Sequence, residues 1–194
     1  MSSATSSAHA TARRAELFDQ LVHLFLTEGF AHLTLDEVAA RLKCSKSTLY
    51  TLARSKEQLV RAATVHFFRG ATASTEAVLA SSTGTRDRLT AYVLAIGDAL
   101  RPASEQFMED LAAFSPAREI YEQNTAIAAD RVAQLITDGV RSGDVRDVHA
   151  AFVADVAASM MVRIQTREVI RRTGLDDSQA YTELAALLAA GLGT

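Results

Sequence analysis

Proline and glycine are scarce in this chain of 194 residues, and alanine is abundant. The sequence contains two prolines and nine glycines against thirty-six alanines. Alanine has the highest intrinsic helix propensity, whereas an all-β fold needs many turns and therefore many turn-forming residues. We therefore expect an all-α protein of about nine helices. Its length suits one substantial core, or a small domain joined to a medium one.

Composition excludes several other classes of protein. With 48% hydrophobic and 22% charged residues, the chain is not mainly disordered. The longest apolar stretch, near Leu184–Leu192, is about half of the 18 to 20 residues that a membrane span needs, so no membrane association is expected. Residues 1–10 lack the composition of a secretory signal and are expected to form a disordered tail. One cysteine, Cys44, permits no internal disulfide, and a cytoplasmic location is expected.

Charge is distributed unevenly along the sequence. Residues 1–70 carry a net charge of +3 and residues 71–194 a net charge of −6. All three lysines lie between positions 43 and 56. The first third is therefore expected to bind a polyanion such as DNA, which the acidic remainder would avoid.

A helix-turn-helix is predicted near the N-terminus. One short helix is expected over 35–42, capped by Thr34, and a second begins at a cap on Ser45 or Ser47 after a tight break. The small residue Ala39 lies where the two helices would cross. In a helix-turn-helix the second helix enters the major groove of DNA, so its outward side chains are candidates for base and phosphate contacts. These side chains are Lys46, Ser47, Thr48, Tyr50 and Thr51.

Four sequence pieces in this region resemble the tetracycline-repressor (TetR) family of transcriptional regulators. They are Leu24-Phe25-x-x-x-Gly29-Phe30, Leu33-Thr34-Leu35-x-x-Val38-Ala39, Ser45-Lys46-Ser47-Thr48-Leu49-Tyr50 and Ser55-Lys56-Glu57-x-Leu59. The chain departs from the family pattern at Lys43 and Ser47, where a glycine is usual, and at Leu52-Ala53, where a histidine and a phenylalanine are usual. The resemblance implies DNA contacts for the outward residues of the second helix, a phosphate-facing cap at Thr34 and a phosphate contact for Lys56.

The expected domains are a helix-turn-helix DNA-binding domain over 11–57 and a helical ligand-binding and dimerisation domain over 58–194. Six helices are expected in the second domain, four of them over 85–100, 103–114, 117–141 and 148–172. Large apolar residues are sparse there among many alanines, which cannot fill the space between helices as leucine does. We therefore expect a mainly apolar pocket. Its candidate lining residues are Phe67, Phe107, Phe114, Tyr121 and Met160. Arg163 is either a surface residue or an inward cation.

The family resemblance further implies a homodimer joined by the last two helices, over 148–172 and 177–191. The interpretation that combines these features is a transcriptional repressor released from a palindromic operator by a small, mainly apolar effector. One alternative is a DNA-binding regulator without a ligand. The other is a helical enzyme or carrier whose N-terminal domain is vestigial.

Motifs of catalysis and metal binding are missing from the sequence. The histidines show no HExxH spacing, no Cys-His set exists, and neither GxSxG nor a phosphate-cradling glycine-rich loop is present. We expect no enzyme activity, no cofactor and no metal site.

Overall fold

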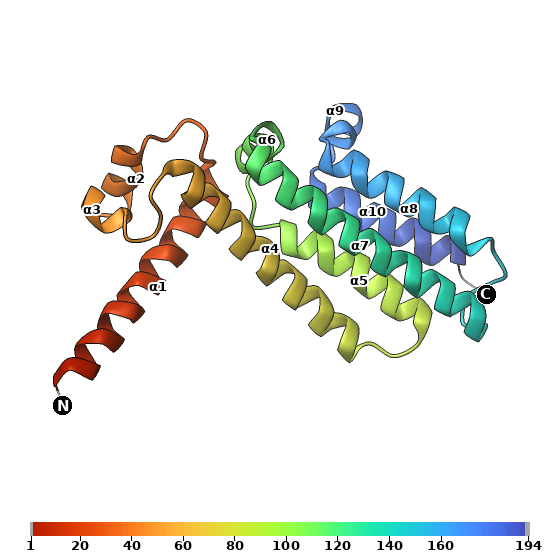
Figure 1. The fold of residues 1–194 in the computed structure, drawn as a ribbon. Coiled ribbons are helices and arrows are strands. Elements are labelled where there is room, and N and C mark those ends of the chain that lie inside the picture. Colours follow the sequence, from red (N-terminus) through yellow and green to blue (C-terminus); the bar gives the residue numbers. More distant parts are fainter. Residues whose placement is uncertain (1, 193–194) are drawn as a thin grey trace. The chain divides into compact units, whose positions relative to one another are not determined.

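The computed structural model describes the backbone of residues 2–192 and the side chains of residues 12–192. In this part of the chain it contains ten helices and no strand, which confirms the predicted all-α class (Figure 1). The helices are α1 (Ser2–Glu28), α2 (Leu35–Arg41), α3 (Lys46–Leu49), α4 (Lys56–Ser81), α5 (Thr85–Leu100), α6 (Glu105–Ala113), α7 (Ser115–Ser142), α8 (Ala150–Gln165), α9 (Glu168–Thr173) and α10 (Asp177–Leu192).

Capping residues fix where several helices begin. The Thr34 hydroxyl accepts a hydrogen bond from the Glu37 backbone N–H, while the Glu37 carboxylate accepts one from the Thr34 N–H, so α2 has a complete capping box. The Ser45 hydroxyl caps α3 by accepting from the Thr48 N–H. Ser104 caps α6 in the same way.

Two features of the helices differ from the sequence-based expectation. Residues 2–10, expected as a disordered tail, continue α1, and Met1 lies outside the described residues. These residues are rich in alanine, and a helix already formed downstream extends at low cost. The single helix expected over 148–172 is divided into α8 and α9 by Arg167, which adopts the left-handed conformation with φ 63°. Its buried guanidinium pairs with Asp177, so a tertiary contact overrides the local helix preference.

The chain folds into two compact units, and the boundary differs from the expected one at residue 57. The first unit contains the residues up to Phe67 together with Ala103–Ala117, so α6 belongs to it. The second contains Phe68–Pro102 and the residues from Arg118 onward. The backbone therefore passes from one unit to the other after residues 67, 102 and 117.

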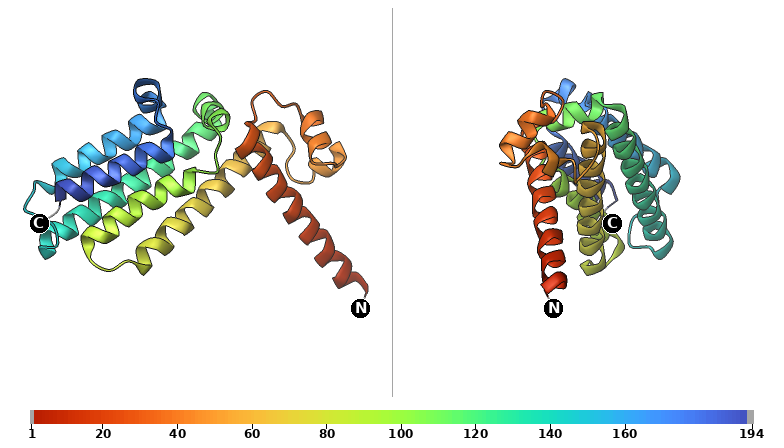
Figure 2. Two further views of the ribbon diagram at one scale, coloured as in Figure 1. Left: turned by 180° about the vertical axis from the view of Figure 1, so that it is seen from behind. Right: turned by 60° about the vertical axis from the view of Figure 1, so that its left-hand side comes forward.

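In the second unit, α5, α7, α8 and α10 lie side by side (Figures 1 and 2). The helix pair α5 and α10 packs closely because Gly97 has no side chain; a Cβ there would lie 3.0 Å from the Ser178 carbonyl oxygen. Buried residues of α10 such as Tyr181, Leu184 and Leu188 fill the interior. Among the described residues, no helix is both long and apolar enough to cross a membrane.

Candidate functional site

The α2–α3 pair has the geometry of a helix-turn-helix. Val38 and Leu49 are buried between the helices, and the Cys44 backbone N–H donates to the Ala39 carbonyl oxygen at 3.0 Å. Lys43, in the turn, adopts the left-handed conformation with φ 51°. Glycine adopts this conformation readily, and it is the usual residue at this position in the TetR family. Cys44 is half-buried rather than fully buried.

The outward face of α3 carries the predicted polar residues. The hydroxyl of Ser45 lies 2.8 Å from the Ser47 hydroxyl and 2.7 Å from the Thr48 hydroxyl, which orders three hydroxyl groups at the start of the helix. Thr51 is exposed and donates to the Thr48 carbonyl oxygen at 2.7 Å. Tyr50 is 46% exposed although it is aromatic. These side chains offer hydroxyl groups and one aromatic ring to a partner.

Lys46 does not extend freely into solvent. Its ammonium lies 2.9 Å from Oδ1 and 3.0 Å from Oδ2 of Asp36 on α2, and both side chains are exposed. The hydrogen bond to Asp36 raises the pKa of Lys46, so the group stays charged. A phosphate or a guanine would compete with Asp36 for this ammonium.

Thr34 and Lys56 lie at the N-termini of α2 and α4. The Thr34 hydroxyl donates to Glu37 Oε2 at 2.8 Å, and Thr34 is exposed. The Lys56 ammonium donates to the Ala31 carbonyl oxygen at 2.8 Å, so one of its three donors is already used within the chain. Both positions remain candidates for phosphate contacts, because helix N-termini attract anions.

Helix α6 holds the turn between α1 and α2. The buried Asp110 carboxylate accepts hydrogen bonds from the backbone N–H groups of Phe30 at 2.6 Å and Ala31 at 2.7 Å. Gly29 permits this contact in two ways. Its φ of +81° is in the left-handed region, and a Cβ at this position would lie 2.7 Å from the Asp110 carboxylate. The turn that leads into the helix-turn-helix is thus fixed by a residue 80 positions away in sequence.

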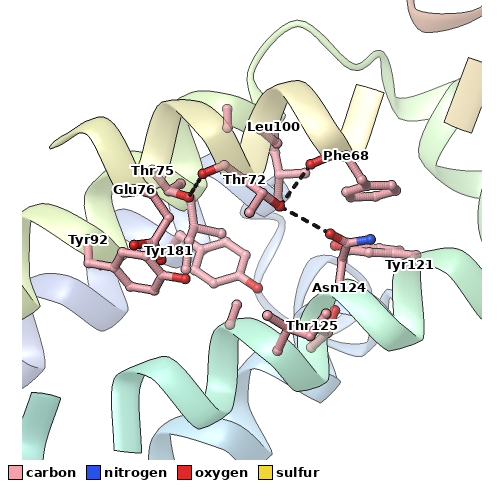
Figure 3. Close-up of a pocket in the computed structure, with 15 residues that line it drawn as sticks. Phe68, Thr72, Thr75, Glu76, Tyr92, Leu100, Tyr121, Asn124, Thr125 and Tyr181 are labelled. Carbon is pink, nitrogen blue, oxygen red and sulfur yellow. Dashed lines mark hydrogen bonds between the residues drawn. The ribbon is translucent and has the colours of Figure 1, made fainter. Parts of the chain in front are cut away.

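The second unit encloses a cavity of about 70 Å³ (Figure 3). Four helices contribute to its wall, and Ile127, which is 61% exposed, lies at its rim. The principal lining residues are Phe68, Thr72, Thr75 and Glu76 of α4, Tyr92, Ile96 and Leu100 of α5, Tyr121, Asn124, Thr125 and Ala128 of α7, and Tyr181 of α10. The volume is well below the typical value of about 300 to 1,000 Å³ for a ligand pocket.

Of the five residues predicted to line a pocket, Tyr121 lines this cavity, and the other four are not among its lining residues. In the first unit, Phe107 and Phe114 instead pack on Phe30 with ring centroids 5.9 Å away, and Phe67 packs on Phe107 at 5.8 Å. Phenylalanine has no polar group to satisfy, so such rings fill space completely. Met160 is half-buried on α8, outside the residues that line the cavity.

Arg163 is also absent from the cavity wall. Its guanidinium forms hydrogen bonds of 3.1 and 3.3 Å with the two carboxylate oxygens of Glu168, near the surface. Sequence reasoning left its orientation open, and the structure favours the surface role.

Among the lining residues that sequence reasoning missed are Tyr92 and Tyr181. With Tyr121, three of the four tyrosines in the chain line the cavity. Burial raises the pKa of Tyr121 and of Tyr181, so both phenols stay protonated. The Tyr121 hydroxyl donates to Asp177 at 3.4 Å, and Asp177 pairs with Arg167 at 2.5 Å. The available signal was chemical: a tyrosine in a helical core needs a polar partner or an aqueous space for its hydroxyl.

Comparison with protein-family models gives one decisive match. Residues 17–63 match the model of bacterial regulatory proteins of the tetR family, and this segment contains α2, α3 and the Lys46–Asp36 pair. The N-terminal segment of the chain is therefore of the tetR type. The tetR-type segment and the exposed polar face of α3 identify a DNA-binding transcriptional regulator. Comparison with curated protein sequences gave no match.

Solved structures share the fold of this chain. A transcriptional regulator from Saccharomonospora viridis in complex with choline is 15% identical, with a TM-score of 0.73 over 94% of this chain and 98% of that one. The regulator PfmR from Thermus thermophilus is 19% identical, with a TM-score of 0.64 over 92% and 99%. The ketosteroid transcriptional regulator KstR2 of Mycobacterium tuberculosis is 20% identical, with a TM-score of 0.62 over 94% and 95%.

Proposed function

We propose that this tetR-family regulator is a homodimeric repressor that is released from a palindromic operator when a small molecule enters the cavity of the second unit. It has no catalytic role in this scheme, and it acts in the cytoplasm, where the DNA is. The observation that carries the proposal is the exposed polar face of α3, supported on a buried α2–α3 interface.

The positions of the polar residues support separate roles in base contacts and in phosphate contacts. Lys46 on α3 and Tyr50 at its C-terminal end are exposed, and a helix in the major groove presents such side chains to base edges. Thr34 and Lys56 lie at helix N-termini, where free N–H groups attract phosphates. We therefore assign Lys46, Ser47, Thr48, Tyr50 and Thr51 to the major groove, and Thr34 and Lys56 to the backbone of the DNA.

A dimer is supported by apolar residues that the single chain leaves exposed on α8 and α10. Phe152 is 65% exposed and Leu187 is 68% exposed, and Val156 and Val162 on α8 are nearly half exposed. These two helices contact each other, so the residues can form one surface. Tyr181, Leu184 and Leu188 on α10 are buried within the chain and belong to its own core. A two-fold interface would place two α3 helices at successive major grooves, about 34 to 36 Å apart.

An effector is supported by the cavity. A regulator without a ligand would have a filled second unit, whereas this one has an aromatic cavity. Thr125 is among its lining residues, and the buried Thr125 hydroxyl has no hydrogen-bond partner among the described residues. The Saccharomonospora viridis regulator of the same fold is in complex with choline. An effector that binds the DNA-incompetent state more tightly by about 1.4 kcal/mol would weaken operator binding tenfold.

Selection of bound sequences from random duplex DNA tests the proposal. We expect an enriched site with two-fold symmetry, an affinity that falls steeply with salt because phosphate contacts release counterions, and a dimer by analytical ultracentrifugation. Leu187→Glu should give monomers and abolish binding to the symmetric site, whereas Glu183→Gln on the same helix should not. A monomeric wild type, or an enriched site without symmetry, would contradict the proposal.

Two lysine variants separate the assigned roles on DNA. Lys46→Ala should cost about 1 to 3 kcal/mol on the selected site and relax its preference at one or two base pairs. Lys56→Ala should weaken binding to all sequences alike and reduce the salt slope by about 1. Equal losses on selected and random DNA for both variants would show that α3 does not read bases.

A further inference from the structure

The chemistry of the cavity wall restricts what it can hold. None of the described residues that line it is a lysine, arginine or histidine, and Glu76 is the one carboxylate among them. An anionic ligand would therefore meet a carboxylate and no positively charged residue of the cavity wall, at a high cost in desolvation. A purely apolar ligand would leave the buried Thr125 hydroxyl without a hydrogen-bond partner.

Aromatic rings lie at both ends of the cavity. Figure 3 places Glu76 at the end where Tyr92 and Tyr181 lie, and Phe68 and Tyr121 at the opposite end. Phe68 and Tyr121 stack on each other, with centroids 5.0 Å apart and an interplanar angle of 20°. Tyr92 and Tyr181 are buried, yet both rings border the open space. Aromatic faces next to a carboxylate are the surroundings that organic ammonium ions prefer in proteins.

The electrostatics at the Glu76 end favour a cation. Glu76 Oε2 lies 3.4 Å from Arg131 Nη2, a long contact, and Arg131 is not part of the cavity wall. Burial is the main cause that raises the pKa of Tyr92. The neighbouring Glu76 carboxylate raises this pKa further, and Arg131 lowers it by less. Of the Glu76–Arg131 ion pair, only the carboxylate belongs to the cavity wall.

We propose that the cavity binds a compact organic cation, whose ammonium group lies beside Glu76 against the rings of Tyr92 and Tyr181. A cavity of about 70 Å³ suits a ligand of a few heavy atoms rather than an extended one. The Thr125 hydroxyl on α7 would bond to a second polar group of such a ligand. The inference rests on the proposed function only in treating this cavity as the effector site.

Three probes of similar shape and different charge test the proposal on the full-length protein without DNA. They are tetramethylammonium, tert-butyl alcohol and pivalate, compared by calorimetry and by ligand-observed NMR. We expect tetramethylammonium to bind at least about tenfold more tightly than tert-butyl alcohol, and pivalate not to bind. Equal affinity for the cation and the alcohol, a preference for pivalate, or no binding of tetramethylammonium would overturn the proposal.

Matched variants locate the cation. Glu76→Gln should reduce the affinity for tetramethylammonium about tenfold and leave the affinity for tert-butyl alcohol unchanged. Asp130→Asn, which removes an exposed α7 carboxylate outside the cavity wall, should change neither. Tyr92→Phe keeps the ring and should retain binding, whereas Tyr92→Leu should lose it. Identical effects of Glu76→Gln and Asp130→Asn, or of the two Tyr92 variants, would contradict the assignment.

The outcome is separable from the test of the proposed function. Operator selection reports on DNA binding without any effector, and probe binding is measured without any DNA. A regulator that binds a symmetric operator but no cation would retain the proposed function and lose this inference. Cation binding by a protein that selects no DNA would retain this inference and contradict the proposed function.

Discussion

The two units of this chain use aromatic residues in opposite ways. In the first unit, Phe30 contacts Phe25, Phe107 and Phe114 with centroid separations of 5.9 Å, and the cluster is filled. In the second, three tyrosines and Phe68 surround a cavity. The boundary between these environments falls between two consecutive residues, since Phe67 packs on Phe107 and Phe68 stacks on Tyr121. The aromatic residues of the first unit thus pack against one another, whereas those of the second border unfilled space.

The largest effect should come from removing a ring of the filled cluster. Phe107 is 2% exposed, and Phe107→Ala should lower the free energy of unfolding by about 3 to 5 kcal/mol because a closed cluster cannot collapse around the hole. Tyr92→Ala should cost at least about 1 kcal/mol less, since Tyr92 already borders unfilled space. Urea titrations of the two variants measure both values. Equal losses would remove the distinction between the clusters.

The next effect concerns how α6 holds the first unit. Asp110→Asn neutralises the carboxylate that accepts hydrogen bonds from the Phe30 and Ala31 N–H groups. Hydrogen bonds to charged groups are worth about 1.5 to 3 kcal/mol, so the free energy of unfolding should fall. Faster hydrogen exchange at these two amides would report the loss locally. Glu109→Gln, an exposed neighbour on α6, should change stability by no more than about 0.5 kcal/mol. Unchanged exchange in Asp110→Asn would mean that α6 does not hold the turn.

A pair of enlarged alanines should give effects of opposite sign. Ala128 lines the cavity, so Ala128→Leu should fill empty space, stabilise the second unit by about 0.5 to 2 kcal/mol and block the binding of probe molecules. Ala117 is fully buried in the first unit, and Ala117→Leu should destabilise that unit by about 1 to 3 kcal/mol through overpacking. Thermal unfolding with and without a probe distinguishes the two. Destabilisation by both variants would indicate that the cavity is too rigid to accept a side chain.

The smallest effect lies in the helix-turn-helix. Lys43 has a left-handed backbone, which disfavours side chains with a Cβ, so Lys43→Gly should stabilise the first unit by about 0.5 to 1 kcal/mol. Lys43→Ala removes the same charge but keeps the Cβ, and it should give no such gain. If the two variants have the same stability, the strain at this turn is negligible.

Sequence reasoning predicted the first unit better than the second because its signals are local. The cap of Thr34 on the first short helix is visible within a few residues, and it is confirmed. The hold of Asp110 on the α1–α2 turn was not predictable, because it joins residues about 80 positions apart.

Most of the cavity's lining residues were missed for a related reason. Its wall comes from four helices, and a helix turns by about 100° per residue, so size alone could not separate the inward Phe68 from its neighbour Phe67. Selecting large apolar residues favoured phenylalanines, which fill space completely. The hydroxyl groups of Tyr92 and Tyr181 were the better indicator, and no periodic pattern reports them. The break between α8 and α9 was likewise decided by a distant ion pair, that of Arg167 with Asp177.

The membership of α6 in the first unit bears on how regulators of this kind can be recombined. A chimera that joins residues up to 67 to the effector-binding part of a relative would carry the matched family segment, yet it would replace Asp110 and Phe107 with whatever the relative has. Gly29 and Phe30 would then pack against different side chains. Transplanting Ala103–Ala117 along with the N-terminal segment keeps these contacts together, so the exchangeable module is discontinuous in sequence. A library of hybrid regulators with a single crossover point would separate these two segments, so it would lose pairs of units that could otherwise be combined.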